Sequence, residues 1–170
     1  ALGLDTKPQI DLANIVADIN APESKVLQRK MVASAVTVVK SANDILPLKN
    51  LNNRKIAVVV MGNENGVKSM FARRCTDYAE ATVFDYNRVG SLDALQQKIA
   101  KGGFNTVIVC VATPAEAYMN AAKQLASAGG DVIVATMCHP EKLDLVGSLM
   151  GNDKVKASLV TYGTTTTDED

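Results

Sequence analysis

The stretch Lys55–Met61 (KIAVVVM) decides the fold, because after its lysine it is a continuous apolar run of strand length. Similar runs occur at 81–86, 105–112, 132–138 and 156–162, with helix-like segments between them. Four of the five runs are nearly unbroken in Val, Ile and Ala, which is typical of parallel strands covered on both faces. The run at 82–86 alternates polar and apolar residues instead, and it predicts an edge strand.

Helix signals fill the segments between these runs. Thr113, Pro114 and Glu116 form a capping-box pattern in which Thr113 caps a helix and Pro114 takes its first position, and a glycine pair ends it. Similar signals mark helices at 91–100 and 140–151. The alternation predicts an α/β fold, a three-layer αβα sandwich on a doubly wound, mostly parallel, five-stranded sheet of flavodoxin-like or Rossmann-like type.

The residues before the first strand divide into two parts. Residues 1–21 are too polar for a strand and predict a connecting arm. From Pro22 the apolar residues recur at helical spacing, which predicts a helix ending near Lys40. The apolar segment Ile45–Leu48 (ILPL) then predicts a pinned, buried connection, because its proline continues neither a helix nor a central strand. The face of that helix contains Leu27, Met31, Ala35, Val38 and Val39.

The predicted organisation is therefore an arm at 1–21, an α/β-sandwich domain at 22–163 and a disordered tail at 164–170, where threonines and acidic residues follow one another. The 18 basic and 18 acidic residues of the 170 give a net charge of +0. Such a balance disfavours nucleic acid and membrane insertion. Aromatic residues make up only 4%, so a carbohydrate-binding module that works unaided is also disfavoured.

The cysteines do not predict a metal site or a disulfide framework. Cys75, Cys110 and Cys138 are odd in number and widely spaced, and His139 is the one histidine. Their apolar neighbours predict buried thiols. The loop 62–66 (GNENG) lacks a phosphate-binding glycine pattern, so no cofactor is predicted.

In a doubly wound sheet, ligands bind beyond the carboxyl ends of the strands, so the loops there are the candidate site. No nucleophile elbow, carboxylate cluster or paired acid and base can be recognised in them, and no catalytic residue is predicted. The residues predicted to meet a substrate or another domain are Asn63, Glu64, Asn65, Thr113, Pro114 and His139.

The segment 38–49 (VVKSANDILPLK), followed by 55–59 (KIAVV), resembles the opening of the C-terminal domain of glycoside hydrolase family 3. In that family an Ile-Leu-Pro-Leu plug precedes the first strand of an α/β sandwich. Residues 2–4 (LGL) resemble the segment that leaves the family's barrel, and 132–143 resembles a strand whose Asn-Pro is here His139-Pro140. Without a Gly-Ser-rich substrate loop, the chain is more similar to the β-N-acetylglucosaminidase branch than to the β-glucosidase branch.

The resemblance implies a C-terminal accessory domain of a β-glycosidase of the β-N-acetylhexosaminidase type, which hydrolyses terminal β-linked sugars. The implied partner is the N-terminal (β/α)₈ barrel of the same full-length protein, and carbohydrate is reached through that barrel. The family's nucleophile lies in the barrel, which needs about 200 residues or more, so the isolated chain is expected to be inactive.

Two alternatives stay open from the sequence. One is a flavodoxin-like module that binds a nucleotide or another small molecule, and the other is a purely structural or interaction domain. The compartment is also open, with a periplasmic or secreted location in a bacterium as one option for the full-length protein.

Overall fold

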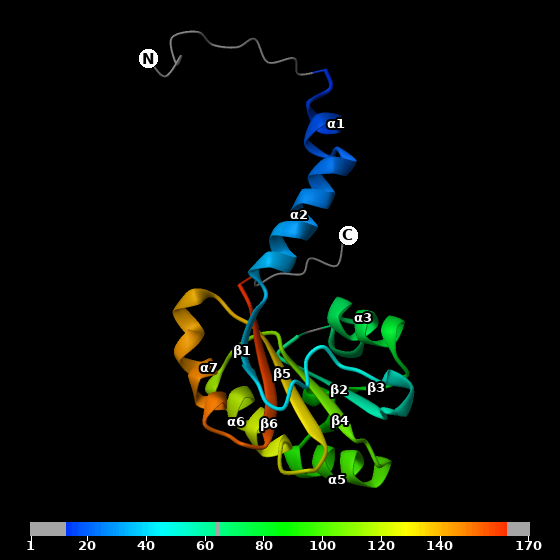
Figure 1. Ribbon diagram of the computed structural model, residues 1–170, viewed down its shortest axis with the longest axis vertical. Coiled ribbons are helices and arrows are strands. Elements are labelled where there is room, and N and C mark those ends of the chain that lie inside the picture. Colours follow the sequence, from blue (N-terminus) through cyan, green and yellow to red (C-terminus); the bar gives the residue numbers. More distant parts are fainter. Residues whose placement is uncertain (1–12, 64, 163–170) are drawn as a thin grey trace. The chain divides into compact units, whose positions relative to one another are not determined.

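The computed structural model describes residues 13–63 and 65–162, and its contacts divide the chain into two units, one through Ser34 and one from Ala35 (Figure 1). The first unit contains α1 (Ile15–Ile19) and α2 (Pro22–Ala35), and neither helix has a buried residue. The boundaries predicted at residues 21 and 163 stay predictions. The tail predicted at 164–170 lies outside the described residues.

The helix predicted to end near Lys40 is shorter, because α2 ends at Ala35 and Thr37–Ser41 forms the strand β1. The cause is the run Val36–Val39, in which every residue is β-branched. Such side chains lose rotamer freedom in a helix and fit a pleated sheet. The apolar face predicted for that helix is divided, because Leu27 and Met31 lie on α2 whereas Val38 and Val39 lie on β1.

Two sets of contacts fix the position of β1. It pairs antiparallel with β6 (Val155–Thr161), and the register shifts between Val38 and Lys40. The Lys40 ammonium donates hydrogen bonds to the carbonyls of Met150 (3.1 Å) and Asn152 (2.8 Å). These carbonyls lie at the end of α7 (Leu143–Met150), where a positive charge is favoured.

The sheet has six strands in the order β1-β6-β5-β4-β2-β3, one strand more than predicted. All neighbours except the β1 and β6 pair are parallel. The edge position predicted for the run at 82–86 is confirmed, because only β2 pairs with β3. The strands not yet bounded are β2 (Ile56–Met61), β3 (Ala81–Asp85), β4 (Thr106–Val111) and β5 (Asp131–Met137).

Two apolar cores form on opposite faces of the sheet. The odd-numbered side chains of β2 pack in the core that includes α5 (Leu92–Gly102), α6 (Glu116–Leu125) and α7. The even-numbered ones pack with α3 (Met70–Tyr78). All six residues of β2 are buried because both faces are covered. The predicted three-layer α/β sandwich is confirmed (Figure 1).

The predicted helix caps are partly correct. Ser91 does cap α5, where its hydroxyl accepts a hydrogen bond from the Ala94 N–H (3.2 Å). Thr113 does not cap α6, which begins at Glu116 without a side-chain cap. The Thr113 hydroxyl donates a hydrogen bond instead to the Gly62 carbonyl, in the loop after β2. The remaining short helices are η1 (Leu51–Asn53), η2 (Gly66–Lys68), α4 (Tyr86–Val89) and η3 (Pro140–Lys142).

The connection Ile45–Leu48 is less deeply buried than predicted. Ile45, Leu46 and Leu48 are half-buried, whereas Pro47 is exposed. The chain turns away from β1 through Asn43 and Asp44, whose φ values are 55° and 50°. Asn and Asp adopt this left-handed conformation more readily than other side chains do.

Candidate functional site

The strand order creates a switch point between β2 and β4, because the chain runs from β2 to β3 on one side and returns to β4 on the other. Doubly wound proteins bind ligands at the carboxyl ends of the strands at such a point. The five parallel strands have the order of flavodoxin-like proteins. The loops after β2 and β4 carry five of the six predicted site residues, namely Asn63, Glu64, Asn65, Thr113 and Pro114.

The loops after β2 and β4 meet directly. The Thr113 hydroxyl donates to the Gly62 carbonyl (2.8 Å), and the Ala112 N–H donates to the Met61 carbonyl (2.9 Å). A Cβ on Gly62 would lie 3.0 Å from the Cβ of Thr113 and 3.0 Å from Cε2 of Tyr118. The two loops are therefore in contact at the switch point, where doubly wound sheets bind their ligands.

The loop after β2 is organised by its own polar groups. The Asn63 side-chain oxygen accepts a hydrogen bond from the Asn65 N–H (2.8 Å), and the Asn63 carbonyl accepts one from the Gly66 N–H (3.1 Å). Such a turn uses the asparagine side chain to fix the backbone. Asn65 is exposed. Glu64 lies outside the described residues, so its predicted role stays a prediction.

Asp85, at the carboxyl end of β3, joins the loops after β2 and β3. Its side chain is 5% exposed, accepts a hydrogen bond from the Asn87 N–H (3.0 Å) and pairs with Nε of Arg88 (3.2 Å). A Cβ on Gly66 would collide with this carboxylate, so the glycine is needed for the close approach. Asp85 caps α4, so its carboxylate oxygens are already used in contacts that stabilise the fold.

A polar and aromatic cluster that the sequence did not predict lies beside the switch point. The rings of Tyr86 and Tyr118 meet edge to face, with centroids 6.0 Å apart. The Tyr118 hydroxyl donates to the Asn87 side-chain oxygen (3.3 Å). Asn87 is exposed and lies in α4, directly after the edge strand β3, at a position that the sequence analysis does not include in the site. Its place after a strand end is the sequence signal that points to it.

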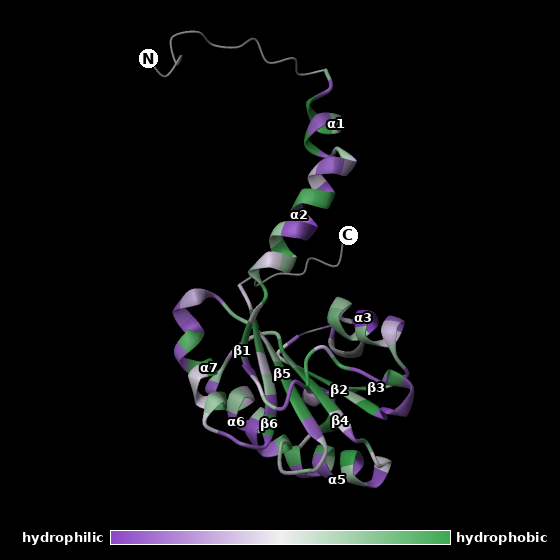
Figure 2. Ribbon diagram, in the orientation of Figure 1, coloured by the Kyte–Doolittle hydropathy of each residue, from purple (hydrophilic) through white to green (hydrophobic). Residues whose placement is uncertain are grey.

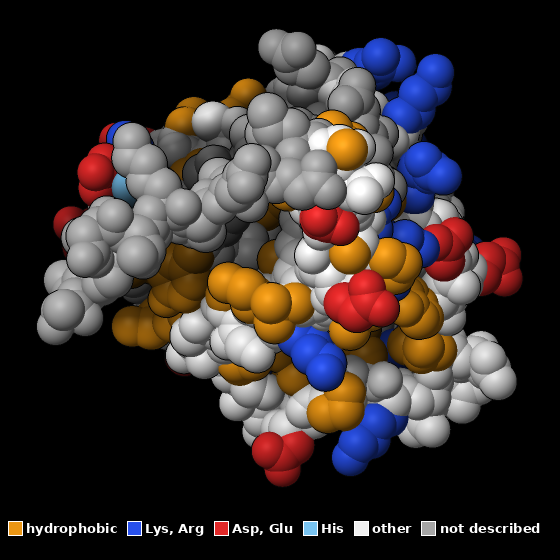
Figure 3. Space-filling view, turned by 90° about the horizontal axis from the view of Figure 1, so that it is seen from above, with side chains coloured by type: hydrophobic (Ala, Val, Ile, Leu, Met, Phe, Trp, Pro, Cys, Tyr) orange, Lys and Arg blue, Asp and Glu red, His pale blue; other side chains and the backbone are white. Residues whose placement is uncertain are grey.

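His139 follows β5 and is exposed, with a side-chain exposure of 61%. Its Nδ1 lies 3.9 Å from a carboxylate oxygen of Glu141, which is itself exposed. The histidine, in pale blue, is visible at the surface in Figure 3. The backbone just before it is tied to β6, because the Cys138 N–H donates to the Thr161 carbonyl (3.1 Å). His139 is therefore a surface residue beyond the carboxyl end of β5, and the carboxylate beside it is exposed.

The three thiols are not poised for chemistry. Burial raises the pKa of the Cys75 thiol to about 11 and that of Cys110 to about 12, and it also raises the pKa of Cys138. A thiol with a raised pKa is a poor nucleophile and metal ligand. Within residues 13–63 and 65–162, no group of three or more His, Cys, Asp or Glu side chains could hold a metal ion. No helix in the described part of the chain is long and apolar enough to cross a membrane.

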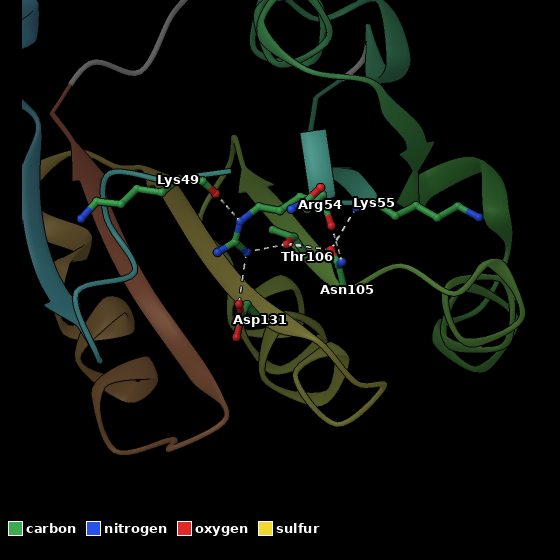
Figure 4. A network of polar contacts seen from close by, with 7 residues as sticks. Lys49, Arg54, Lys55, Asn105, Thr106 and Asp131 are labelled. Carbon is green, nitrogen blue, oxygen red and sulfur yellow. Dashed lines mark hydrogen bonds and ion pairs between the residues drawn. The ribbon is translucent and has the colours of Figure 1, made fainter. Parts of the chain in front are cut away.

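Two shallow hollows lie at the amino ends of the strands, opposite the predicted loops. One measures about 210 Å³ and the other about 310 Å³, and Arg54 lines both. The Arg54 guanidinium donates to the Lys49 carbonyl (3.0 Å) and the Thr106 hydroxyl (2.8 Å), and it pairs with Asp131 (3.2 Å; Figure 4). These contacts tie together the starts of β2, β4 and β5. The network therefore stabilises the amino end of the sheet.

Asn105 completes this network (Figure 4). Its side-chain oxygen accepts a hydrogen bond from the Lys55 N–H (3.0 Å), and its amide group donates to the Asn53 carbonyl (3.1 Å). The Asn105 carbonyl also accepts from the Asp131 N–H (2.9 Å). All of these hydrogen bonds join groups at the amino ends of the strands to one another, so they stiffen that end of the sheet.

Taken together, the geometry defines a doubly wound α/β sandwich in which the loops after β2 and β4 are in contact at the switch point. No protein-family model matches the chain, and no curated protein matches it significantly. Solved structures do match. A fungal multi-domain GH3 β-N-acetylglucosaminidase, described with a GCN5-related glucosamine N-acetyltransferase region, is 20% identical with a TM-score of 0.62, and the match covers 93% of this chain and 18% of that one.

Two further matches are β-glucosidases. The one from Listeria innocua is 15% identical with a TM-score of 0.59, covering 87% of this chain and 24% of that one. The one from Erythrobacter marinus is 14% identical with a TM-score of 0.62, covering 94% and 29%. At these identities the likeness establishes the fold. The chain corresponds to between about a fifth and a third of the length of the proteins it matches.

Proposed function

We propose that this chain is the α/β-sandwich domain of a larger β-glycosidase, in which it supports a separate catalytic module. One observation carries the proposal: nearly the whole chain has the fold of a part of each of three much longer glycosidases. The Ile45–Leu48 plug just before the first parallel strand adds an independent resemblance in sequence, to glycoside hydrolase family 3.

Two of the described carboxylates at the carboxyl ends of the strands support a location of the chemistry outside this chain. Retaining glycosidases need two carboxyl groups about 5–5.5 Å apart, one as nucleophile and one as acid and base. Asp85 is bound to Arg88 and to the start of α4, and Glu141 is exposed beside His139. Neither is arranged as half of such a pair. The catalytic module in this proposal is a (β/α)₈ barrel.

The finer part of the proposal concerns specificity and contact. By resemblance, the full-length enzyme is of the β-N-acetylhexosaminidase type, and the edge loops of this chain face its barrel or its sugar. Asn87, which is exposed at the same end of the sheet, joins the residues proposed for this contact from the sequence. Those residues are Asn63, Glu64, Asn65, Thr113, Pro114 and His139. Amide and hydroxyl groups of this kind form hydrogen bonds with sugar hydroxyls.

Two experiments test the proposal. The purified chain should not hydrolyse nitrophenyl β-N-acetylglucosaminide or nitrophenyl β-glucoside, and measurable turnover would overturn the supporting role. In the full-length glycosidase, Asn65→Ala, Asn87→Ala and His139→Ala should change kcat or KM. Gln97→Ala, at an exposed position on α5, is the control and should change neither. If the edge variants also change neither, the contact role is wrong and only the supporting role remains.

The strand order favours one second candidate, a flavodoxin-like site for a nucleotide or another small molecule. The close approach of Thr113 and Tyr118 to Gly62 weighs against it, since the two loops meet where such a ligand usually binds. A thermal-shift screen decides between the two. A true ligand at a hundred times its Kd stabilises the folded chain by about 2.7 kcal/mol, whereas a supporting domain responds to none.

A further inference from the structure

The loop after β2 contains the one asparagine of the chain that is followed by a glycine, Asn65–Gly66. β2 is hydrophobic along its length (Figure 2), and the chain becomes polar just beyond it, at Asn63. Asn65 is exposed, whereas Gly66 is buried. An asparagine before a glycine is chemically labile, because no side chain on the glycine shields its nitrogen from the asparagine amide carbon. The Asn65 side chain is thus open to modification without an enzyme.

The reaction needs only this pair of residues and water. The Gly66 backbone nitrogen loses its proton to hydroxide and attacks Cγ of Asn65, which closes a five-membered imide. The Cγ–Nδ2 bond breaks, and Nδ2 leaves as ammonia after taking a proton from water. Water then adds to one imide carbonyl and breaks the bond from that carbonyl to the Gly66 nitrogen. Opening at Cγ gives aspartate, opening at the main-chain carbonyl gives isoaspartate, and both products are negatively charged at neutral pH.

The fold requires the glycine that makes Asn65 labile. Gly66 has a φ of +50°, which favours glycine, and a Cβ there would collide with the Asp85 carboxylate. That carboxylate is 5% exposed and pairs with Arg88. A larger residue at position 66 would shield Asn65 but would not fit beside Asp85. The labile pair is therefore a consequence of the packing at the end of β3.

The folded loop holds the peptide group between Asn65 and Gly66 away from the reactive geometry. The ψ of Asn65 is −17°, so along the Cα–C bond the Gly66 nitrogen lies near the Asn65 nitrogen and not near its Cβ. Ring closure requires rotation about this bond. The rotation breaks two hydrogen bonds, from the Gly66 N–H to the Asn63 carbonyl (3.1 Å) and from the Lys68 N–H to the Asn65 carbonyl (2.9 Å). The loop must therefore open locally before the reaction.

The Asn63 side chain adds a third restraint, because its oxygen accepts a hydrogen bond from the Asn65 N–H (2.8 Å). We propose that Asn65 is a site of spontaneous deamidation and that the opening of this turn sets the rate. The modification places a carboxylate in the loop after β2. This inference goes beyond the proposed function and does not depend on it, since the reaction needs only this chain and water.

The test incubates the chain in mildly alkaline buffer, folded and unfolded in guanidinium chloride, and follows each asparagine by peptide mass spectrometry. In the folded chain, Asn65 should exchange its amide NH2 for OH before any other asparagine. Unfolding should speed the reaction at Asn65 by about fivefold or more, because two hydrogen bonds no longer have to break. The rate should rise with pH, since the attacking nitrogen must first lose its proton.

Two variants at position 63 test the control by the turn. Asn63→Ala removes the acceptor of the Asn65 N–H and should speed the reaction in the folded chain about two- to tenfold. Asn63→Asp keeps an acceptor oxygen in the same place and is the matched control, so it should leave the rate unchanged. Circular dichroism checks that each variant is folded. If Asn63→Ala does not fold, the folded and unfolded states of the original chain decide.

Three results would overturn the proposal. The absence of conversion at Asn65 in the folded chain would show that it is not a modification site. Equal rates in the folded and unfolded chain would show that the hydrogen bonds of the loop do not control the reaction. Equal rates in folded Asn63→Ala and Asn63→Asp would show that the Asn63 side chain does not restrain the turn. None of these results affects the proposed function, which the glycosidase assays test separately.

Discussion

Replacing Gly62 with alanine tests whether the loops after β2 and β4 close the switch point. Gly62 has a φ of +70°, and a Cβ there would lie 3.0 Å from atoms of both Thr113 and Tyr118. The left-handed backbone costs alanine about 1 kcal/mol relative to glycine. Crowding against packed neighbours adds about 1–3 kcal/mol. The free energy of unfolding should therefore fall by about 2–4 kcal/mol, which for a chain of this size corresponds to roughly 10 °C in melting temperature.

Gly103→Ala is the matched control. Gly103 has a φ of +64°, and no atom lies within 4 Å of the position of its Cβ, so alanine there meets only the backbone cost of about 1 kcal/mol. Urea unfolding followed by circular dichroism measures both variants. The difference between them isolates the contact with Thr113 and Tyr118. Equal losses would refute the closed switch point and would reopen the small-molecule alternative.

Three further predictions concern stability. Thr136→Val should raise the free energy of unfolding by about 1–2 kcal/mol, because among the described residues the buried Thr136 hydroxyl has no hydrogen-bond partner. Urea unfolding measures this change. A lower free energy of unfolding in the variant would mean that the hydroxyl does have a hydrogen-bond partner. Arg54→Met should cost about 1–2 kcal/mol through its lost contacts with Thr106 and Asp131, whereas Arg74→Met, whose pair with Asp77 is exposed, should cost less than about 0.5 kcal/mol in the same assay. The pKa of Cys75 is raised from 9.0 to about 11, so the unfolded chain loses this proton first as the pH rises. The free energy of unfolding should therefore fall between about pH 9 and pH 11, and the fall should be smaller in Cys75→Ala; an identical pH dependence would contradict the raised pKa.

The fold could be predicted from the sequence where one signal dominated. Four nearly unbroken apolar runs and one alternating run located the five parallel strands, since a strand covered on both faces is mostly apolar. β1 was missed because Val38 and Val39 fit both a helical spacing and a strand. The pairing of β1 with β6, more than a hundred residues away, decided between the two.

The candidate site was predictable only in part, because its geometry depends on contacts between loops that are distant in sequence. Strand ends located Asn63, Thr113 and His139 at one edge, as parallel topology requires. The hydrogen bond from Thr113 to Gly62 could not be read from a capping-box pattern, since the same hydroxyl has two acceptable uses. Asn87 and Tyr118 meet through their side chains across 31 residues, and no local pattern records that contact.

The closed switch point bears directly on how this fold can assist another module. Where the loops after β2 and β4 stand apart, they can enclose a ligand. Here the Thr113 hydroxyl binds the Gly62 carbonyl, and the exposed side chains of Asn87 and His139 lie on the segments after β3 and β5 at the same end of the sheet. Loops that are fixed before binding lose little conformational entropy when they meet a second surface. The same contact that weighs against a ligand of its own thus favours a domain that completes the site of a partner.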